Sequence, residues 1–159
     1  MTSVASVIGS AVLLILVWKD LQLRRLPNAL VAIHALAFLP YAYASGLTWP
    51  EFGWHAATAL ATFGVTLIFF SLGWLGGGDV KLWSSVMLWA GPGLALPAVI
   101  VATLAGGVLG IVCWLAQKLL PKLQHTAWRA PLRLLSAERG VPYGVALSLA
   151  GLLVLWARH

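Results

Sequence analysis

Long apolar runs separated by short polar stretches dominate the sequence. The runs are continuous, as in membrane-spanning helices, and do not alternate between polar and apolar residues as the strands of a membrane β-barrel do. Most are close to the roughly 20 residues that a helix needs to cross a bilayer. We expect residues 1–159 to form a single transmembrane domain of the all-α class. The pattern predicts a polytopic membrane protein with six transmembrane helices, over residues 3–19, 29–45, 55–73, 77–91, 94–117 and 141–157.

The fourth and fifth predicted helices are separated by a Gly-Pro-Gly sequence at residues 91–93. Glycine and proline are typical of turns, so this segment predicts a turn more than one long kinked helix. In the fifth helix Ala102, Gly106 and Gly110 recur every four residues, a spacing that lets two membrane helices pack closely.

The composition agrees with a membrane protein and excludes several other classes. The chain is 61% hydrophobic and 9% charged, with a mean hydropathy of +0.93, whereas soluble domains carry about 25% charged residues. The single cysteine, Cys113, rules out a disulfide framework and a Cys-rich zinc site, and the four histidines lack metal-ligand spacing. We therefore expect no metal and no cofactor. The net charge of +6 does not favour nucleic acid binding, because the basic residues lie between apolar runs.

The basic residues predict how the chain is oriented in the membrane. With six spans, every Lys and Arg except Arg158 falls on one side. Positive residues are enriched in cytoplasmic loops, so that side is predicted to be the cytoplasm, with both termini on the non-cytoplasmic side. We expect the basic loop of residues 118–140 to lie on anionic lipid. The residues on the cytoplasmic side are Lys19, Arg24, Arg25, Lys81, Lys118, Lys122, Arg129, Arg133 and Arg139.

Two of the four acidic residues lie at the same predicted membrane depth. Asp20 and Asp79 each sit at the cytoplasmic end of a predicted span, whereas Glu51 and Glu138 fall in loops, where we expect them to be solvated. Ionisable side chains at membrane depth are costly, and by default they suggest a function. Each aspartate also has a structural interpretation. Asp20 could pair with Arg24, four residues later, and Asp79 could cap the helix that starts beside it.

Two neighbouring carboxyl groups can hydrolyse a peptide bond. Both cannot ionise at low cost, so they share one proton. The charged group can take a proton from water while the neutral group donates one to the carbonyl oxygen. Gly76, Gly77 and Gly78 precede Asp79 and, lacking a Cβ, allow a substrate backbone or the first helix to approach it closely. The sequence therefore predicts a paired-carboxylate site formed by Asp20 and Asp79.

Three segments resemble motifs of the type IV prepilin peptidases, which are polytopic aspartic proteases of the inner membrane. "GGGDVKL", residues 76–82, matches the Gly-x-Gly-Asp motif of that family. "DLQLRRLPN", residues 20–28, resembles the segment of the family's first aspartate, with Leu26 in place of isoleucine. "VPYGVALSLAG", residues 141–151, resembles the start of the family's last span.

The resemblance implies an aspartic endopeptidase of the Gly-x-Gly-Asp type, with Asp20 and Asp79 as the catalytic pair. It implies a bacterial inner-membrane protein with its active site at the cytoplasmic face. Its partners would be the lipid bilayer and the substrate, a type IV prepilin or pseudopilin whose short basic leader is cut just before the hydrophobic helix. We expect Tyr143 either to contact the substrate or to anchor its helix at the membrane interface. The residues expected to shape the site are Gly76, Gly77, Gly78, Lys81, Arg24, Pro27, Asn28, Pro142, Tyr143 and Gly144.

One difference from the larger relatives narrows the expected activity. The larger members of the prepilin peptidase family, which this chain resembles, carry a Cys-rich cytoplasmic insert. They also methylate the N-terminal residue of the pilin that cleavage exposes. With one cysteine and a first span that runs almost directly into Asp20, this chain is similar to the short, peptidase-only enzymes of tight-adherence pilus systems.

Three other functions remain open. Presenilin-type intramembrane proteases share the Gly-x-Gly-Asp motif but pair it with a Tyr-Asp element, whereas Asp20 follows Lys19 here. A non-catalytic membrane scaffold of a pilus or secretion system would not require both aspartates. A small transporter would place its polar groups near the bilayer midplane, whereas Asp20 and Asp79 are predicted near one face.

Overall fold

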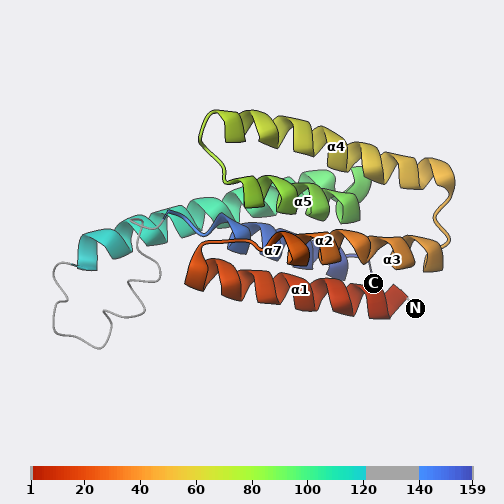
Figure 1. Ribbon diagram of the computed structural model, residues 1–159, viewed down its shortest axis with the longest axis horizontal. Helices are drawn as coiled ribbons and strands as arrows, with labels where there is room; N and C mark the ends of the chain where they lie inside the picture. Colours follow the sequence, from red (N-terminus) through yellow and green to blue (C-terminus); the bar gives the residue numbers. More distant parts are fainter. Residues whose placement is uncertain (1, 121–139, 159) are drawn as a thin grey trace.

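The computed structural model describes residues 2–120 and 140–158, and this part of the chain is all-helical (Figure 1). Residues 121–139 lie outside the described part, and with them most of the basic loop that we expect on anionic lipid, including Glu138. The helices are α1 (Thr2–Leu23), α2 (Asn28–Leu36), α3 (Phe38–Ala44), α4 (Trp49–Ser71), α5 (Gly77–Leu119) and α7 (Tyr143–Trp156).

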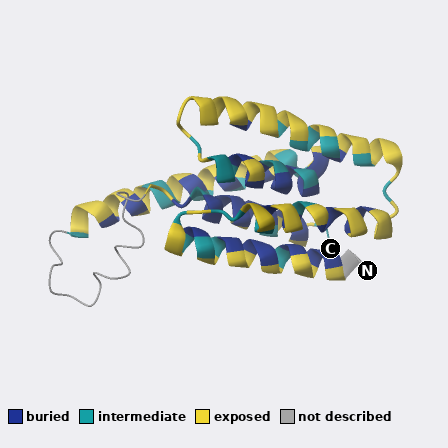
Figure 2. Ribbon diagram, in the orientation of Figure 1, coloured by how far each residue is buried: buried dark blue, intermediate teal, exposed yellow. Residues whose placement is uncertain are grey.

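Several of these helices have the character of membrane spans. By length and composition, Val4–Leu23, Trp49–Ser71 and Gly77–Leu119 could each cross a membrane, and Asn28–Ala44 and Tyr143–Trp156 are shorter apolar helices. Large apolar side chains such as Leu60 and Val65 lie exposed on α4, which Figure 2 shows exposed along most of its length. An apolar surface of this extent is unfavourable in water and suits lipid. The predicted all-α class is thus confirmed for the described residues, with three candidate spans.

The start of α4 differs from the prediction. The helix begins at Trp49 rather than at residue 55, because Thr48 and Glu51 cap its first turn. The backbone N–H of Glu51 donates to Thr48 Oγ1 at 3.5 Å, and the backbone N–H of Thr48 donates to Glu51 Oε2 at 2.8 Å. This reciprocal arrangement satisfies N–H groups that have no partner within the helix. The prediction that Glu51 lies solvated in a loop was therefore wrong in part, since Glu51 is exposed but belongs to α4.

The second predicted span consists of two helices, α2 and α3. Pro40 lacks the N–H that would donate to the carbonyl oxygen of Leu36, so regular helical bonding is interrupted where α2 ends. Hydrogen bonds between buried polar groups connect α2 to α5. Trp89 Nε1 donates to the carbonyl oxygen of His34 at 2.9 Å, and His34 Nδ1 lies 2.6 Å from Ser85 Oγ.

The long helix α5 reverses direction at Gly91 (Figure 1). A straight helix of 43 residues would be about 65 Å long, roughly twice the thickness of a hydrocarbon core. Gly91 is the residue inside α5 whose backbone angles are not helical, with φ 57° and ψ −172°. The turn predicted at residues 91–93 is therefore present, but Gly91 alone forms it, because Pro92 already belongs to the second helical part.

Substituting Gly91 is expected to destabilise the bundle. An added Cβ would lie 2.5 Å from His55 Cε1, and His55 is held in place because its Nδ1 donates to the carbonyl oxygen of Leu88 at 2.7 Å. With φ 57° and ψ −172°, Gly91 takes a backbone conformation that is almost exclusive to glycine, and a residue with a Cβ would be strained there by about 1–3 kcal/mol. We expect Gly91→Ala to lower the Tm in detergent by several degrees, measured by the loss of helical circular dichroism. Gly93→Ala is the matched control, since a Cβ there meets nothing within 4 Å; equal Tm values for the two variants would contradict this account.

The core lies between α1, α7 and α5. Leu16 of α1, Val86 of the first part of α5 and Leu147 of α7 are fully buried there, and α5 and α7 share the most extensive helix contact. Figure 2 shows the buried residues concentrated on these helices and the exposed ones on their outer faces.

The predicted small-residue face of α5 is confirmed for two of its three positions. Ala102 and Gly106 are buried, and a Cβ on Gly106 would lie 2.9 Å from Tyr143 Cε2. Gly110 is further along the helix, where a Cβ would meet nothing within 4 Å, because α7 begins only at Tyr143 and does not reach that turn.

Candidate active site

Asp20 lies in the last turn of α1 and is buried against the N-terminus of α7. Its Oδ2 accepts a hydrogen bond of 3.2 Å from the backbone N–H of Val145, which is in the first turn of α7. The first N–H groups of a helix have no acceptor within the helix and carry partial positive charge, so they bind a carboxylate favourably. The N-terminus of α7 thus fixes the position of the Asp20 carboxyl group.

Gly144 makes this contact possible. A Cβ at this position would lie 2.9 Å from Asp20 Oδ2 and 2.8 Å from Leu26 Cδ2, closer than non-bonded atoms can approach. Pro142 is the N-cap of α7 and is fully buried. The helix therefore begins next to the carboxyl group of Asp20. The Pro-Tyr-Gly sequence therefore forms the surface of α7 against which Asp20 packs.

Asp79 lies in the first turn of α5. Its Oδ2 accepts a hydrogen bond of 3.2 Å from the backbone N–H of Gly76, the N-cap residue. The structural interpretation of Asp79 as a helix cap is therefore correct, and it holds together with the position of Asp79 on the cavity described below. Arg24 similarly lies near enough to Asp20 to interact with its charge.

The connection between α1 and α2 is held against the start of α5. A Cβ on Gly78 would lie 3.0 Å from Leu26 Cβ, so the glycine allows this connection to approach closely. Lys81 Nζ donates a hydrogen bond of 3.0 Å to Asn28 Oδ1. Arg24, with φ 51°, takes the left-handed conformation that often ends a helix. These contacts fix the segment after Asp20 next to Asp79.

The two carboxyl groups share one cavity of about 410 Å³. They are near enough that the charge of Asp20 acts on Asp79. The cavity is formed by three segments that are far apart in the sequence: the end of α1 with its connection to α2, the start of α5, and the start of α7. Its lining residues are Asp20, Arg24, Arg25, Leu26, Asn28, Gly76, Gly77, Gly78, Asp79, Val141 and Tyr143.

The residues expected at the site take two kinds of position. Arg24, Asn28, the three glycines and Tyr143 line the cavity, whereas the other four support it from outside: Pro27, Lys81, Pro142 and Gly144. Pro27 is the N-cap of α2. Sequence reasoning missed Arg25, Leu26 and Val141 as lining residues. All three lie inside or beside the quoted motifs, so their proximity in sequence was the available signal.

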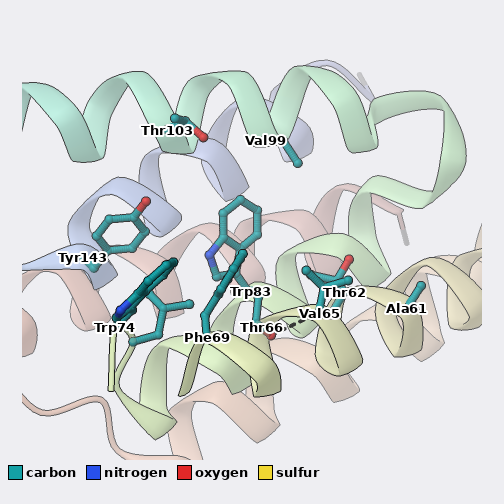
Figure 3. A pocket seen from close by; sticks show the side chains of 11 residues that line it. Ala61, Thr62, Val65, Thr66, Phe69, Trp74, Trp83, Val99, Thr103 and Tyr143 are labelled. Atoms are coloured by element: carbon teal, nitrogen blue, oxygen red, sulfur yellow. Dashed lines mark hydrogen bonds between the residues drawn. The ribbon is translucent and has the colours of Figure 1, made fainter. Parts of the chain in front are cut away.

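Tyr143 lies between this cavity and a second, more apolar one. It lines both, and its ring is partly buried against Gly106 of α5. The second cavity, of about 520 Å³, lies between α4 and α5. In Figure 3 Tyr143 and Trp74 lie at one end of this cavity, and Thr103 and Val99 belong to the second part of α5. Tyr143 therefore lines the cavity of the carboxyl pair, and its contact with the substrate stays a prediction.

The site offers acid–base chemistry by two carboxyl groups, each held by a backbone N–H at the start of a helix. Among residues 2–120 and 140–158, no group of three His, Cys, Asp or Glu side chains is arranged to hold a metal ion.

Comparison with known proteins identifies the family. The model of the type IV leader peptidase family matches residues 7–111, a segment that is more than half of the chain and contains both aspartates and the glycine triplet. Searches of the curated proteins and of the solved structures gave no match. The match to the family model shows that the chain belongs to the type IV leader peptidase family.

Proposed function

We propose that the chain is an integral-membrane aspartic endopeptidase that removes the short basic leader of type IV prepilins or pseudopilins. The observation that carries this proposal is the single cavity shared by Asp20 and Asp79, in a chain of the type IV leader peptidase family. Family membership and the apolar helices indicate a membrane-associated peptidase. The aspartic mechanism, the substrate and the place of cleavage at the cytoplasmic face of a bacterial inner membrane are our proposals.

In the proposed mechanism the two carboxyl groups act on one water molecule. The ionised carboxylate takes a proton from the water molecule, and the water oxygen bonds to the carbonyl carbon of the scissile peptide. The neutral carboxyl group donates its proton to the carbonyl oxygen. The carboxyl group that took the proton from water then donates it to the peptide nitrogen as the C–N bond breaks, while the other carboxylate takes a proton from a hydroxyl group of the tetrahedral intermediate. These steps release the leader's carboxyl group and the amino group of the mature pilin, and they restore the starting protonation of the pair. The pair shares its protons, so neither Asp20 nor Asp79 has a fixed role as acid or base.

The helix N-termini orient both groups for this reaction. In each aspartate the Oδ2 atom is held by a backbone N–H, from Val145 for Asp20 and from Gly76 for Asp79. We place the water and the substrate carbonyl against the Oδ1 atoms. Fixed N–H dipoles of this kind stabilise the charge on a carboxylate without reorganisation during the reaction.

We further propose that the chain crosses the membrane six times. The two parts of α5 on either side of Gly91 would each span, and α2 and α3 together would form one span. This topology is supported by the position of the C-terminal segment, where Arg158 donates to the carbonyl oxygen of Ala90 at 3.0 Å, next to the reversal of α5. In Figure 1 the start of α1 and the end of α7 lie at that end of the bundle, opposite the end of α1 and the start of α5, which carry the carboxyl pair.

Cysteine labelling tests this topology. In a Cys113→Ala background, Ser45→Cys lies in the connection between α3 and α4, and Leu72→Cys lies in the connection between α4 and α5; both positions are exposed. We expect a membrane-impermeant maleimide added to intact spheroplasts to label Ser45→Cys, and to label Leu72→Cys only after permeabilisation. The reverse pattern would place the carboxyl pair on the non-cytoplasmic side and contradict the proposed orientation.

The basic residues of the leader need a place outside the catalytic cavity. Arg24 and Arg25 line that cavity, and their charge repels other cations. We therefore place the leader's basic residues against the anionic lipid headgroups of the cytoplasmic leaflet, with only the scissile bond reaching the carboxyl pair.

Cleavage of a co-expressed prepilin tests the proposed function. We expect the mass of the pilin to fall by that of its leader when the wild-type chain is present, with an unmethylated N-terminal residue because the activity is peptidase only. An unchanged prepilin in the presence of folded, membrane-inserted protein would favour the alternative, a non-catalytic scaffold of a pilus or secretion system.

A further inference from the structure

The cavity between α4 and α5 has walls suited to apolar side chains. Aromatic and aliphatic residues form most of its surface, including Phe69, Trp83 and Val99 (Figure 3). Two of its threonines add little polarity, because their hydroxyl groups donate within α4: Thr62 to the carbonyl oxygen of Thr58 and Thr66 to that of Thr62, both at 2.8 Å.

This cavity opens toward the lipid-facing side of the bundle. Val65, Phe69, Trp74 and Val99 line it and are exposed. In a chain with membrane-spanning helices, such a groove can be entered sideways from the bilayer. Its volume of about 520 Å³ is close to one turn of a helix, since a helix about 10 Å across and 5.4 Å in pitch fills about 400 Å³ per turn.

The groove lies next to the catalytic cavity, with Tyr143 at their boundary. This residue lines both cavities, and the charge of Asp79 acts on its side chain. Gly106 of α5 leaves room for the ring, because a Cβ there would lie 2.9 to 3.2 Å from three Tyr143 atoms. A peptide with its scissile bond at Asp79 would therefore pass Tyr143 as it leaves the carboxyl pair along α4.

We propose that this groove binds the first apolar turn of the substrate after the scissile bond, with Tyr143 positioning the chain between groove and carboxyl pair. This inference rests on the proposed function. The two cavities differ in the way that the two sides of such a substrate differ. The leader side is basic and polar, and the apolar groove would not solvate it. In the prepilin that the resemblance implies as substrate, a hydrophobic helix follows the cut, and such a helix matches the groove in chemistry and location.

Photo-crosslinking tests the occupant directly. A benzophenone amino acid replaces Val99 on the groove wall or, as matched control, Leu104, which is exposed on the same helix but does not line the groove. Both are made in the Asp79→Asn background so that prepilin stays uncut. We expect a cross-link from position 99 to the first residues after the cleavage site, and little from position 104. Equal cross-linking from both positions, or cross-links from position 99 to lipid alone, would overturn the proposal.

Groove filling gives a second, kinetic readout. We expect Val99→Trp to lower kcat/KM for full-length prepilin at least 10-fold. For a short peptide that ends soon after the scissile bond, kcat/KM should change less than 2-fold. Leu104→Trp should change neither. If Val99→Trp affects both substrates equally, or neither, the groove does not bind the apolar segment. Failure of the wild-type protein to cut prepilin would instead refute the proposed function, so the two failures are distinct.

Discussion

Asp20→Asn and Asp79→Asn are each expected to lower kcat/KM for leader cleavage by about 10³-fold or more. Asparagine keeps the size of the side chain, and its carbonyl oxygen can still accept the hydrogen bond from Val145 or from Gly76. It cannot ionise or donate an acidic proton, so the pair can no longer move protons between water and the peptide. The measurement is the initial rate of cleavage of a purified prepilin by each variant in lipid vesicles.

Glu51→Gln is the matched control for these variants. Glu51 is also an acidic residue in the first turn of a helix, but it lies on α4, in the capping pair with Thr48, and does not line the catalytic cavity. We expect its cleavage rate to stay within 2-fold of wild type. An Asp20→Asn or Asp79→Asn protein that is folded and still cuts at a tenth of the wild-type rate would return that aspartate to a structural role.

Gly144→Ala is expected to lower kcat/KM by about 10²-fold with a small change in stability. The added Cβ would overlap Asp20 Oδ2 and Leu26 Cδ2, which are the ends of flexible side chains and can move aside. A shift of the Asp20 carboxyl group by about 1 Å changes its position relative to Asp79, and displacements of that size can lower the rate about 10²-fold. The catalytic loss should therefore exceed any loss of folded protein.

Gly107→Ala is the control for this substitution, since a Cβ there meets nothing within 4 Å. Cleavage rates and Tm values in detergent are compared for both variants. If Gly144→Ala cuts at the wild-type rate, or loses activity only in proportion to the folded protein lost, Gly144 does not set the position of Asp20.

The sequence predicted that Asp20 and Asp79 lie together, because each falls at the end of an apolar run on the same predicted side, and the two residues line one cavity. The sequence also predicted the place of the turn in α5, because glycine can take backbone angles that strain a residue with a Cβ, and Gly91 takes such angles. Position 55 was a poor estimate of the start of α4, because capping by Thr48 and Glu51 extends a helix beyond its apolar run.

Apart from the proximity of Asp20 and Asp79, contacts between distant segments could not be predicted. No local pattern shows that the N–H of Val145 binds Asp20, because the contact depends on how α7 packs against α1. The same holds for the His34 and Ser85 pair inside the bundle, where both residues read in the sequence as isolated polar positions. The apolar groove is likewise a product of packing between α4 and the two parts of α5, with Tyr143 added by α7.

A double-mutant cycle on the cleavage rate tests most directly whether Asp20 and Asp79 form one catalytic unit. The rates of wild type, Asp20→Asn, Asp79→Asn and the double variant are measured on the same prepilin in vesicles. We expect both single variants and the double variant to share the same residual rate, because losing either carboxyl disables the pair. If the two losses multiply in the double variant, or either single variant cuts well, the aspartates act independently and the paired-carboxylate mechanism is wrong.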